Sequence, residues 1–132
     1  MQEPPKGIVT DAKVVNVVDG DTIDLKIEKT IRVRLKDCWC AETRTGDLEE
    51  KEKGLAAKHH IEDLLGKRVL YYGRKKFNKD VVLFIPADED GEIKDVFTFN
   101  RVLGYVFVDG EDISERMVMD GHATKKKYGR ER

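Results

Sequence analysis

Three short stretches of the sequence carry acidic or basic side chains at positions where they could bind a cation or an anion. In the first, Asp19-Gly20-Asp21-Thr22, a hairpin-turn signal is followed at once by a second aspartate. Asp21 shares the alternation of the apolar Ile23 and Leu25, so we expect it at the rim of the core-facing side of a strand. A carboxylate held there needs a partner, and a hard cation is one. Alternatively, the two aspartates only form and cap the turn.

The other two stretches contain Arg34 with Glu42, eight residues apart, and Arg101 at the start of an apolar run. An arginine offers a planar fork of donors that matches phosphate oxygens. A glutamate can take a proton from an attacking water. Taken singly, Arg34 and Glu42 could equally form a surface ion pair, and Arg101 alone indicates little.

The elements that must position these residues follow from hydrophobic periodicity. Alternation predicts strands over 8–18, 23–27 and 31–35, which form a meander. An apolar stripe predicts a helix that begins near Glu49 and ends before Gly66, the usual residue for a left-handed C-terminal cap. Further strands are expected at 69–72, 81–85, 96–99 and 102–108, with a turn at Asp109-Gly110 and a short helix over 113–118 that ends by Gly121.

Short strands in a curled meander, a helix and then more strands indicate a mainly β fold with helices. We expect an OB-type five-stranded barrel with an extended hairpin, in a single domain that spans residues 1–132. Residues 1–7 and 124–132 are expected to be flexible ends. Barrels of this type commonly bind nucleic acids on one outer face.

Charge is abundant and uneven along the chain. Charged residues make up 39% of the 132 residues, and the net charge is −1. Residues 67–79 hold six bases and no acid, 116–132 hold six bases and two acids, and 86–95 hold five acids and one base. Local fields of this kind attract a polyanion. The residues expected to contact nucleic acid are Lys75, Lys76, Lys125, Lys126, Lys127 and Tyr128.

Composition also limits the compartment and the cofactor chemistry. No apolar run approaches the ~20 residues of a membrane span, and no signal peptide is evident, so we expect a cytoplasmic monomer. The two cysteines of Cys38-Trp39-Cys40 form no disulfide framework and make a poor zinc site, so we expect reduced, partly buried thiols. His59 and His60 are adjacent on the helix and are expected at its surface or boundary.

The order of the motifs resembles the staphylococcal nuclease (thermonuclease-like) family. The resemblance is carried by Val18-Asp19-Gly20-Asp21-Thr22, the Arg34 and Glu42 pair, and three later runs. These runs are Gly54-Leu55-Ala56-Ala57, Arg101-Val102-Leu103-Gly104-Tyr105 and Gly121-His122-Ala123. The match covers about residues 9 to 123 and implies an OB-type barrel with helices, in agreement with the periodicity. It also implies calcium-dependent hydrolysis of DNA or RNA phosphodiesters at the bond to the 5′ oxygen.

The resemblance implies a role for each matching residue. Arg34 and Arg101 would clamp the scissile phosphate, and Glu42 would be the general base. Asp21 would be a calcium ligand, the backbone carbonyl of Cys40 would be another, and Asp19 would lie in the next layer around the ion. DNA or RNA would be the partner.

The chain departs from the family pattern in places that bear on the metal. Trp39 stands where the family has a second metal-binding aspartate, so we expect calcium to bind weakly, and Ala41 replaces a proline. A different register would set Arg32 against Asp37 and restore the aspartate. Trp39 could pack on the barrel or stack on a base. An acidic insertion precedes Arg101, Phe99-Asn100 stand where a nucleotide-contacting tyrosine is found, and the family's last helix is expected to be absent.

Three functions therefore remain open at this stage. The first is a metal-dependent nuclease. The second is a nuclease-like module that binds nucleic acid or protein with weak or lost catalysis, which Trp39 favours. The third is an OB-type module with no nucleic-acid role, which the net charge of −1 permits. The retained Arg34, Glu42 and Arg101 favour the enzyme, because a binding module has little need of a base facing two phosphate clamps.

Overall fold

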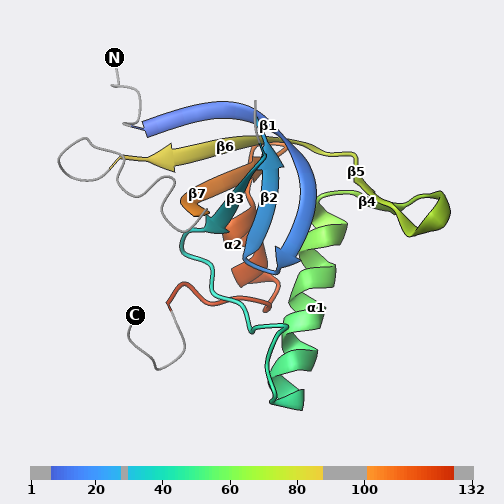
Figure 1. The fold of residues 1–132 in the computed structure, drawn as a ribbon. Helices are drawn as coiled ribbons and strands as arrows, with labels where there is room; N and C mark the ends of the chain where they lie inside the picture. The colour runs from blue at the N-terminus through green and yellow to red at the C-terminus, as the bar shows by residue number, and fades with distance from the viewer. Residues whose placement is uncertain (1–6, 28–29, 88–100, 127–132) are drawn as a thin grey trace.

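The computed structural model describes residues 7–27, 30–87 and 101–126. Five of its strands form a closed barrel, and a long helix crosses one end of the barrel and extends beyond it (Figure 1). The barrel strands are β1 (Gly7–Asp19), β2 (Thr22–Lys26), β3 (Thr30–Leu35), β6 (Asp80–Pro86) and β7 (Arg101–Val108). The expected class, a mainly β OB-type barrel with helices, is confirmed.

Closure of the barrel depends on one parallel pairing. The strands run in the order β3-β2-β1-β6-β7, with antiparallel neighbours, and β3 then pairs with β7 in parallel. The long strand β1 pairs with both β2 and β6. The register of its pairing with β2 shifts after Val14 and after Val17, and these irregularities mark where the strand bends. Because alternate residues point inward, Ile23, Leu25 and Val33 are fully buried in the barrel core.

Helix α1 (Leu48–Leu64) closes one end of the barrel. Its first turn is capped by Asp47, whose carboxylate accepts hydrogen bonds from the backbone N–H groups of Glu49 and Glu50 at 3.0 and 3.2 Å. The predicted apolar stripe faces the core, where Ala57 and Ile61 are fully buried. The helix ends at Leu64, and Gly66, just past the cap residue Leu65, has φ +73° as its predicted capping role requires.

The strand predicted over 69–72 is wrong. Instead, β4 (Lys67–Val69) runs into a 3₁₀ turn, η1 (Tyr71–Gly73), and returns as β5 (Lys75–Phe77). The chain reverses because Tyr72 and Gly73 both have positive φ angles, 65° and 73°. The resulting hairpin projects sideways from the C-terminal end of α1 (Figure 1). The strand expected at 96–99 and the acidic insertion lie outside the described residues.

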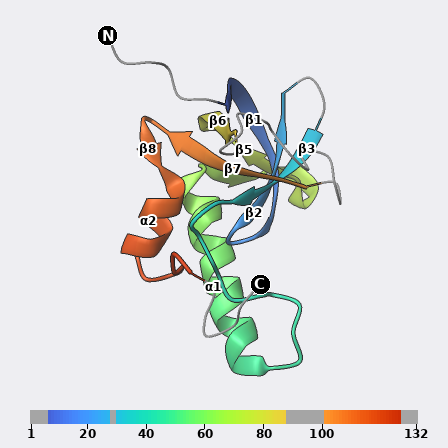
Figure 2. The ribbon, with the colours of Figure 1, turned by 90° about the vertical axis from the view of Figure 1, so that its left-hand side faces the viewer.

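The C-terminal part of the fold follows the sequence closely. Asp109 and Gly110, with φ +52° and +80°, turn β7 into the short strand β8 (Glu111–Asp112). Helix α2 (Ile113–Met119) begins at the cap Asp112 and lies beside α1 in the second view (Figure 2). Neither helix in the described part of the chain has the length and apolar content that a membrane crossing requires.

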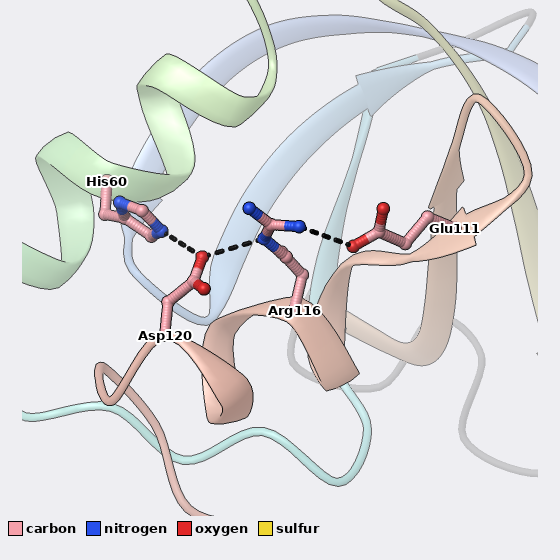
Figure 3. Close-up of polar contacts among 4 residues, drawn as sticks. All are labelled: His60, Glu111, Arg116 and Asp120. Carbon is pink, nitrogen blue, oxygen red and sulfur yellow. Dashed lines mark hydrogen bonds and ion pairs between the residues drawn. The ribbon is translucent and has the colours of Figure 1, made fainter.

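A chain of polar contacts joins α2 to α1 (Figure 3). Asp120 accepts from Arg116 at 2.9 Å and lies 2.6 Å from Nε2 of His60, while Arg116 also pairs with Glu111 at 3.5 Å. The His60 contact and the Arg116 contact lower the pKa of Asp120. The His60 ring also stacks on His122, with ring centroids 4.4 Å apart. His60 is therefore a boundary residue, as expected, with a partner that the sequence did not reveal.

This junction predicts a pH-dependent contribution to stability. Burial and the neighbouring His60 ring lower the pKa of His122 below its ordinary value of 6.5. The unfolded chain therefore binds a proton at His122 more readily than the folded chain, and folding stability falls as the pH drops through about 6.5. The variant His122→Phe keeps an aromatic ring and has no proton to bind. Its urea midpoint should fall less than that of the native protein between about pH 7.5 and pH 5.5.

The matched control for this prediction is His59→Phe, because His59 is exposed on α1. Its pH dependence should equal that of the native protein. An undiminished fall in the midpoint of His122→Phe would show that the stacked histidine does not carry the effect.

Candidate functional site

A cleft of about 1060 Å³ opens between the ends of the barrel strands, the loop after β3 and α1 as far as Lys58. Five of the predicted site residues line it together: Asp19, Asp21, Arg34, Cys40 and Glu42. These residues come from the β1–β2 turn, from β3 and from the loop that follows. Their convergence depends on barrel closure and on the docking of α1.

Asp21 is the buried centre of the cleft. Its Oδ1 accepts a hydrogen bond from the Thr22 hydroxyl at 2.9 Å. Its Oδ2 accepts one from the backbone N–H of Cys40 at 3.1 Å and one from Nη2 of Arg34 at 3.4 Å. Its own carbonyl accepts from the backbone N–H of Leu35 at 2.8 Å. One carboxylate thus ties the turn, strand β3 and the following loop together, at the core-facing rim that alternation predicts.

Arg34 is held between a carboxylate and an aromatic ring. Its side chain is only 9% exposed, and its guanidinium carbon lies 3.9 Å from the centroid of the Trp39 ring. The ring therefore packs on Arg34, one form of the packing that the sequence left open for Trp39. The buried Nε of Arg34 has no acceptor among the described residues. A fixed guanidinium with donors to spare at the wall of a cleft is suited to an anion.

Glu42 is exposed in the same cleft, and its loop is positioned by a glycine of α1. A Cβ added to Gly54 would lie 2.4 Å from the carbonyl oxygen of Glu42. A second close approach occurs at Gly20, where a Cβ would lie 2.7 Å from that of Ala57. The helix can press against both the loop and the turn only because these two positions lack side chains.

The alternative register through Arg32 and Asp37 gains no support from the geometry. Arg32 pairs with Asp24 at 2.9 Å, and this hydrogen bond raises the pKa of the guanidinium. Asp37 lies outside the cleft lining, in an exposed turn, and accepts from the Tyr105 hydroxyl at 2.7 Å. Burial and the contact with Asp37 raise the pKa of Tyr105 to about 12, so the phenol stays a donor.

Several cleft residues were not predicted. Among the described side chains that line the cleft, five are basic and six are acidic. The basic members that the sequence did not indicate are Arg44, Lys53 and Lys58. They belong to no local motif, since the loop and helix that carry them meet the barrel only in the folded chain. The cleft is close to charge-balanced, so its attraction for a polyanion is local, at Arg34 and its basic neighbours.

The donors fit at most a weak metal site. No group of three or more His, Cys, Asp and Glu side chains that could hold an ion occurs in residues 7–27, 30–87 and 101–126. The Asp21 carboxylate already accepts three hydrogen bonds, one of them from a backbone N–H, of about four that a carboxylate can take. Asp19, expected in the next layer around the ion, accepts instead from the Thr43 hydroxyl. A cation would depend on the remaining lone pair of Asp21, the Cys40 carbonyl, water and a bound phosphate.

The two cysteines are buried and form no disulfide among the described residues. The reduced state expected from the sequence stays a prediction. A hydrogen bond with Cys38 and burial raise the pKa of the Cys40 thiol. The thiol is therefore neutral at physiological pH and is a poor metal ligand or nucleophile.

The predicted nucleic-acid contacts fall in different places. Lys75 pairs with the buried carboxylate of Glu62 at 3.3 Å, whereas Lys76 is exposed on the hairpin. Lys125 and Lys126 are exposed next to Thr124, whose backbone bridges Trp39 at the cleft wall. Thr124, expected in a flexible end, is thus held in place.

Three predicted residues lie wholly or partly outside the described part of the chain. Arg101 begins β7 with its backbone beside that of Arg32, and its side chain is not described. Lys127 and Tyr128 lie outside the described residues. The second phosphate clamp therefore stays a prediction.

Comparison with known proteins adds no assignment: no protein-family model matches the chain, and no curated protein matches it.

The contact at Gly54 predicts an unusual response to substitution. In an exposed helix interior, replacing glycine by alanine stabilises by about 1 kcal/mol. Here the added Cβ meets the Glu42 carbonyl, so Gly54→Ala should destabilise the fold by about 1–3 kcal/mol in urea denaturation. Gly46→Ala is the control, because its Cβ would meet no heavy atom within 4 Å. A gain of stability in Gly54→Ala would refute the close approach of loop and helix.

The donor set predicts how calcium binding responds to a second carboxylate. The native protein should bind calcium with a dissociation constant at or above about 1 mM. Trp39→Asp places a carboxylate beside Arg34 and Asp21 and should tighten binding measurably in calorimetry. Trp39→Leu removes the ring without adding charge and should not. Tight binding by the native protein, with no gain in Trp39→Asp, would mean that other donors hold the ion.

Proposed function

We propose that this chain is a nuclease that hydrolyses phosphodiester bonds of DNA or RNA. The observation that carries the proposal is the meeting of Arg34 and Glu42 in one cleft. A buried, oriented guanidinium and an exposed carboxylate are the two groups that in-line hydrolysis of a phosphodiester needs most. The order of motifs that resembles the staphylococcal nuclease family supports the same reaction.

The proposed reaction assigns one task to each group. The Glu42 carboxylate takes a proton from a water molecule as the water oxygen attacks phosphorus. The bond from phosphorus to the leaving 5′ oxygen breaks, and that oxygen takes up a proton from solvent. Arg34 donates to the non-bridging oxygens, where negative charge grows in the transition state.

Asp21 and Trp39 act through Arg34 in this proposal. The ion pair with Asp21 and the stack on Trp39 hold the guanidinium in one orientation before substrate arrives. Because the guanidinium is already oriented, less reorganisation free energy is needed to stabilise the negative charge that develops in the transition state. Arg101 is proposed as the second clamp from the start of β7.

Calcium is proposed as a weakly held cofactor of this site. Asp21 and the Cys40 carbonyl would hold it, and it would supply Lewis-acid stabilisation of the phosphate. Because few protein donors remain, the bound substrate would itself complete the coordination.

One observation favours a different function. The Asp21 carboxylate already neutralises Arg34, and the cleft lining carries slightly more acids than bases. Both features would suit a module that binds nucleic acid or protein without efficient catalysis. Digestion of single-stranded DNA with calcium, with magnesium and with a chelator separates the two, because such a module cleaves under none of these conditions.

The base is tested by Glu42→Gln, which keeps the shape of the side chain and removes its basicity. Cleavage should fall by about 10²–10⁴-fold, while binding of a single-stranded oligonucleotide is retained. Arg34→Lys should likewise lose cleavage far more than binding, because it keeps the charge and loses the fork. The control is Glu52→Gln, at an exposed position of α1 outside the cleft lining. Native-like cleavage by Glu42→Gln would remove Glu42 from the proposed role.

A further inference from the structure

The hairpin formed by β4, η1 and β5, here the basic hairpin (residues 67–77), is anchored by a buried carboxylate. Glu62 of α1 is 1% exposed and accepts from Lys67 at 3.4 Å and from Lys75 at 3.3 Å. A buried carboxylate requires such partners, because leaving it unpaired is costly. Phe77 packs into the core beside them. One face of the hairpin is thereby fixed on the helix.

The opposite face of the hairpin carries basic side chains that form no ion pair with the described residues. Arg68 and Lys76 are direct cross-strand partners, and both are exposed. Like charges in this position repel and destabilise a hairpin. In the part of the chain that the structure describes, neither side chain has an ion pair. Arg74, also exposed, adds a third positive charge near the tip.

Apolar and aromatic residues are exposed toward the tip of the same hairpin. Tyr72 is 89% exposed at the tip, in a left-handed conformation that is strained for a residue with a side chain. Val69 and Leu70 are 67% and 44% exposed. An exposed aromatic ring on the same hairpin as exposed arginine and lysine side chains matches a ligand that alternates negative charge with flat apolar rings.

We propose that the basic hairpin is a second binding surface, which holds single-stranded nucleic acid outside the cleft. Arg68, Lys76 and Arg74 contact phosphates, and Tyr72 stacks on a base. A duplex offers no unstacked base to Tyr72, so the surface prefers a single strand. The identity of the polymer rests on the proposed nuclease function, whereas the charged surface itself does not.

The placement of the hairpin suits this task. The cleft lining follows α1 from Glu49 to Lys58. The hairpin leaves the C-terminal end of the same helix (Figure 1). From Lys58, the cleft residue nearest to that end, to Leu64 the helix rises about 9 Å. A strand bound at both places would therefore run along α1, and only an oligonucleotide long enough to span this distance would gain from the hairpin.

The test measures binding by fluorescence anisotropy, with the full chain in a chelator so that the probe stays intact. The probes are a trinucleotide, a single strand of about 16 nucleotides and a blunt duplex of the same length. Arg68→Ala/Lys76→Ala should weaken binding of the long strand and reduce the slope of log K against log salt by about 1.4, at about 0.7 per phosphate contact. Its effect on the trinucleotide should be small.

Tyr72→Ala should weaken binding of the long single strand by roughly tenfold and change duplex binding much less. Lys26→Ala/Lys51→Ala is the matched control, because it removes the same charge from exposed positions elsewhere. Thermal unfolding of each variant shows whether a loss of binding comes from a folding defect. Arg68→Ala/Lys76→Ala should be at least as stable as the native protein, since it relieves repulsion.

Several outcomes would overturn the inference. Native-like binding and salt dependence in Arg68→Ala/Lys76→Ala would do so, as would an equal loss in the charge control. If anionic lipid vesicles bind the native protein and not this variant while oligonucleotides bind both, the hairpin is a membrane contact. Equal losses on single strand and duplex in Tyr72→Ala would remove the preference for single strands.

Failure of this inference is distinguishable from failure of the proposed function. If the native chain cleaves nucleic acid and the hairpin variants bind normally, the proposed nuclease function is supported and the second binding surface is refuted. If the native chain cleaves nothing and the hairpin variants lose binding as expected, the second surface is supported and the nuclease function is refuted.

Discussion

A buried carboxylate cannot stay charged without partners, and the cleft is organised around the way in which Asp21 obtains them. Its oxygens draw in the Thr22 hydroxyl, the backbone of Cys40 and the guanidinium of Arg34. The loop after β3 must therefore return to the β1–β2 turn, which brings Glu42 into the cleft. Removal of the carboxylate would leave a buried arginine and a backbone N–H unsatisfied at once. Asp21 is thus a structural residue whatever else it does.

Residues with local signals were predictable from the sequence. Alternation places β1, β2 and β3 within a residue or two, and the same alternation sets Asp21 at the inner rim of its strand. The end of α1 before Gly66 and the turn at Gly110 follow from the freedom of glycine at positive φ. These features depend on residues that are close together in the sequence, so the sequence alone predicts them.

Residues whose partners are remote in sequence were not predictable. The strand pattern over 69–72 failed because the reversal there depends on Tyr72 adopting a conformation that its type disfavours. The pairing of Lys75 with Glu62 and of His60 with Asp120 needs the packing of separate elements. Trp39 could not be assigned to Arg34 for the same reason, since its place depends on the Thr124 bridge.

Trp39 is the single tryptophan of the chain, and its indole lies against the guanidinium of Arg34. The intrinsic emission of the protein in the tryptophan band therefore originates from one wall of the cleft and from nowhere else. Any ligand that draws Arg34 away from the ring alters the polarity that the indole experiences. The molecule thus carries its own optical probe at Arg34, and occupancy of the cleft can be followed in solution without a label.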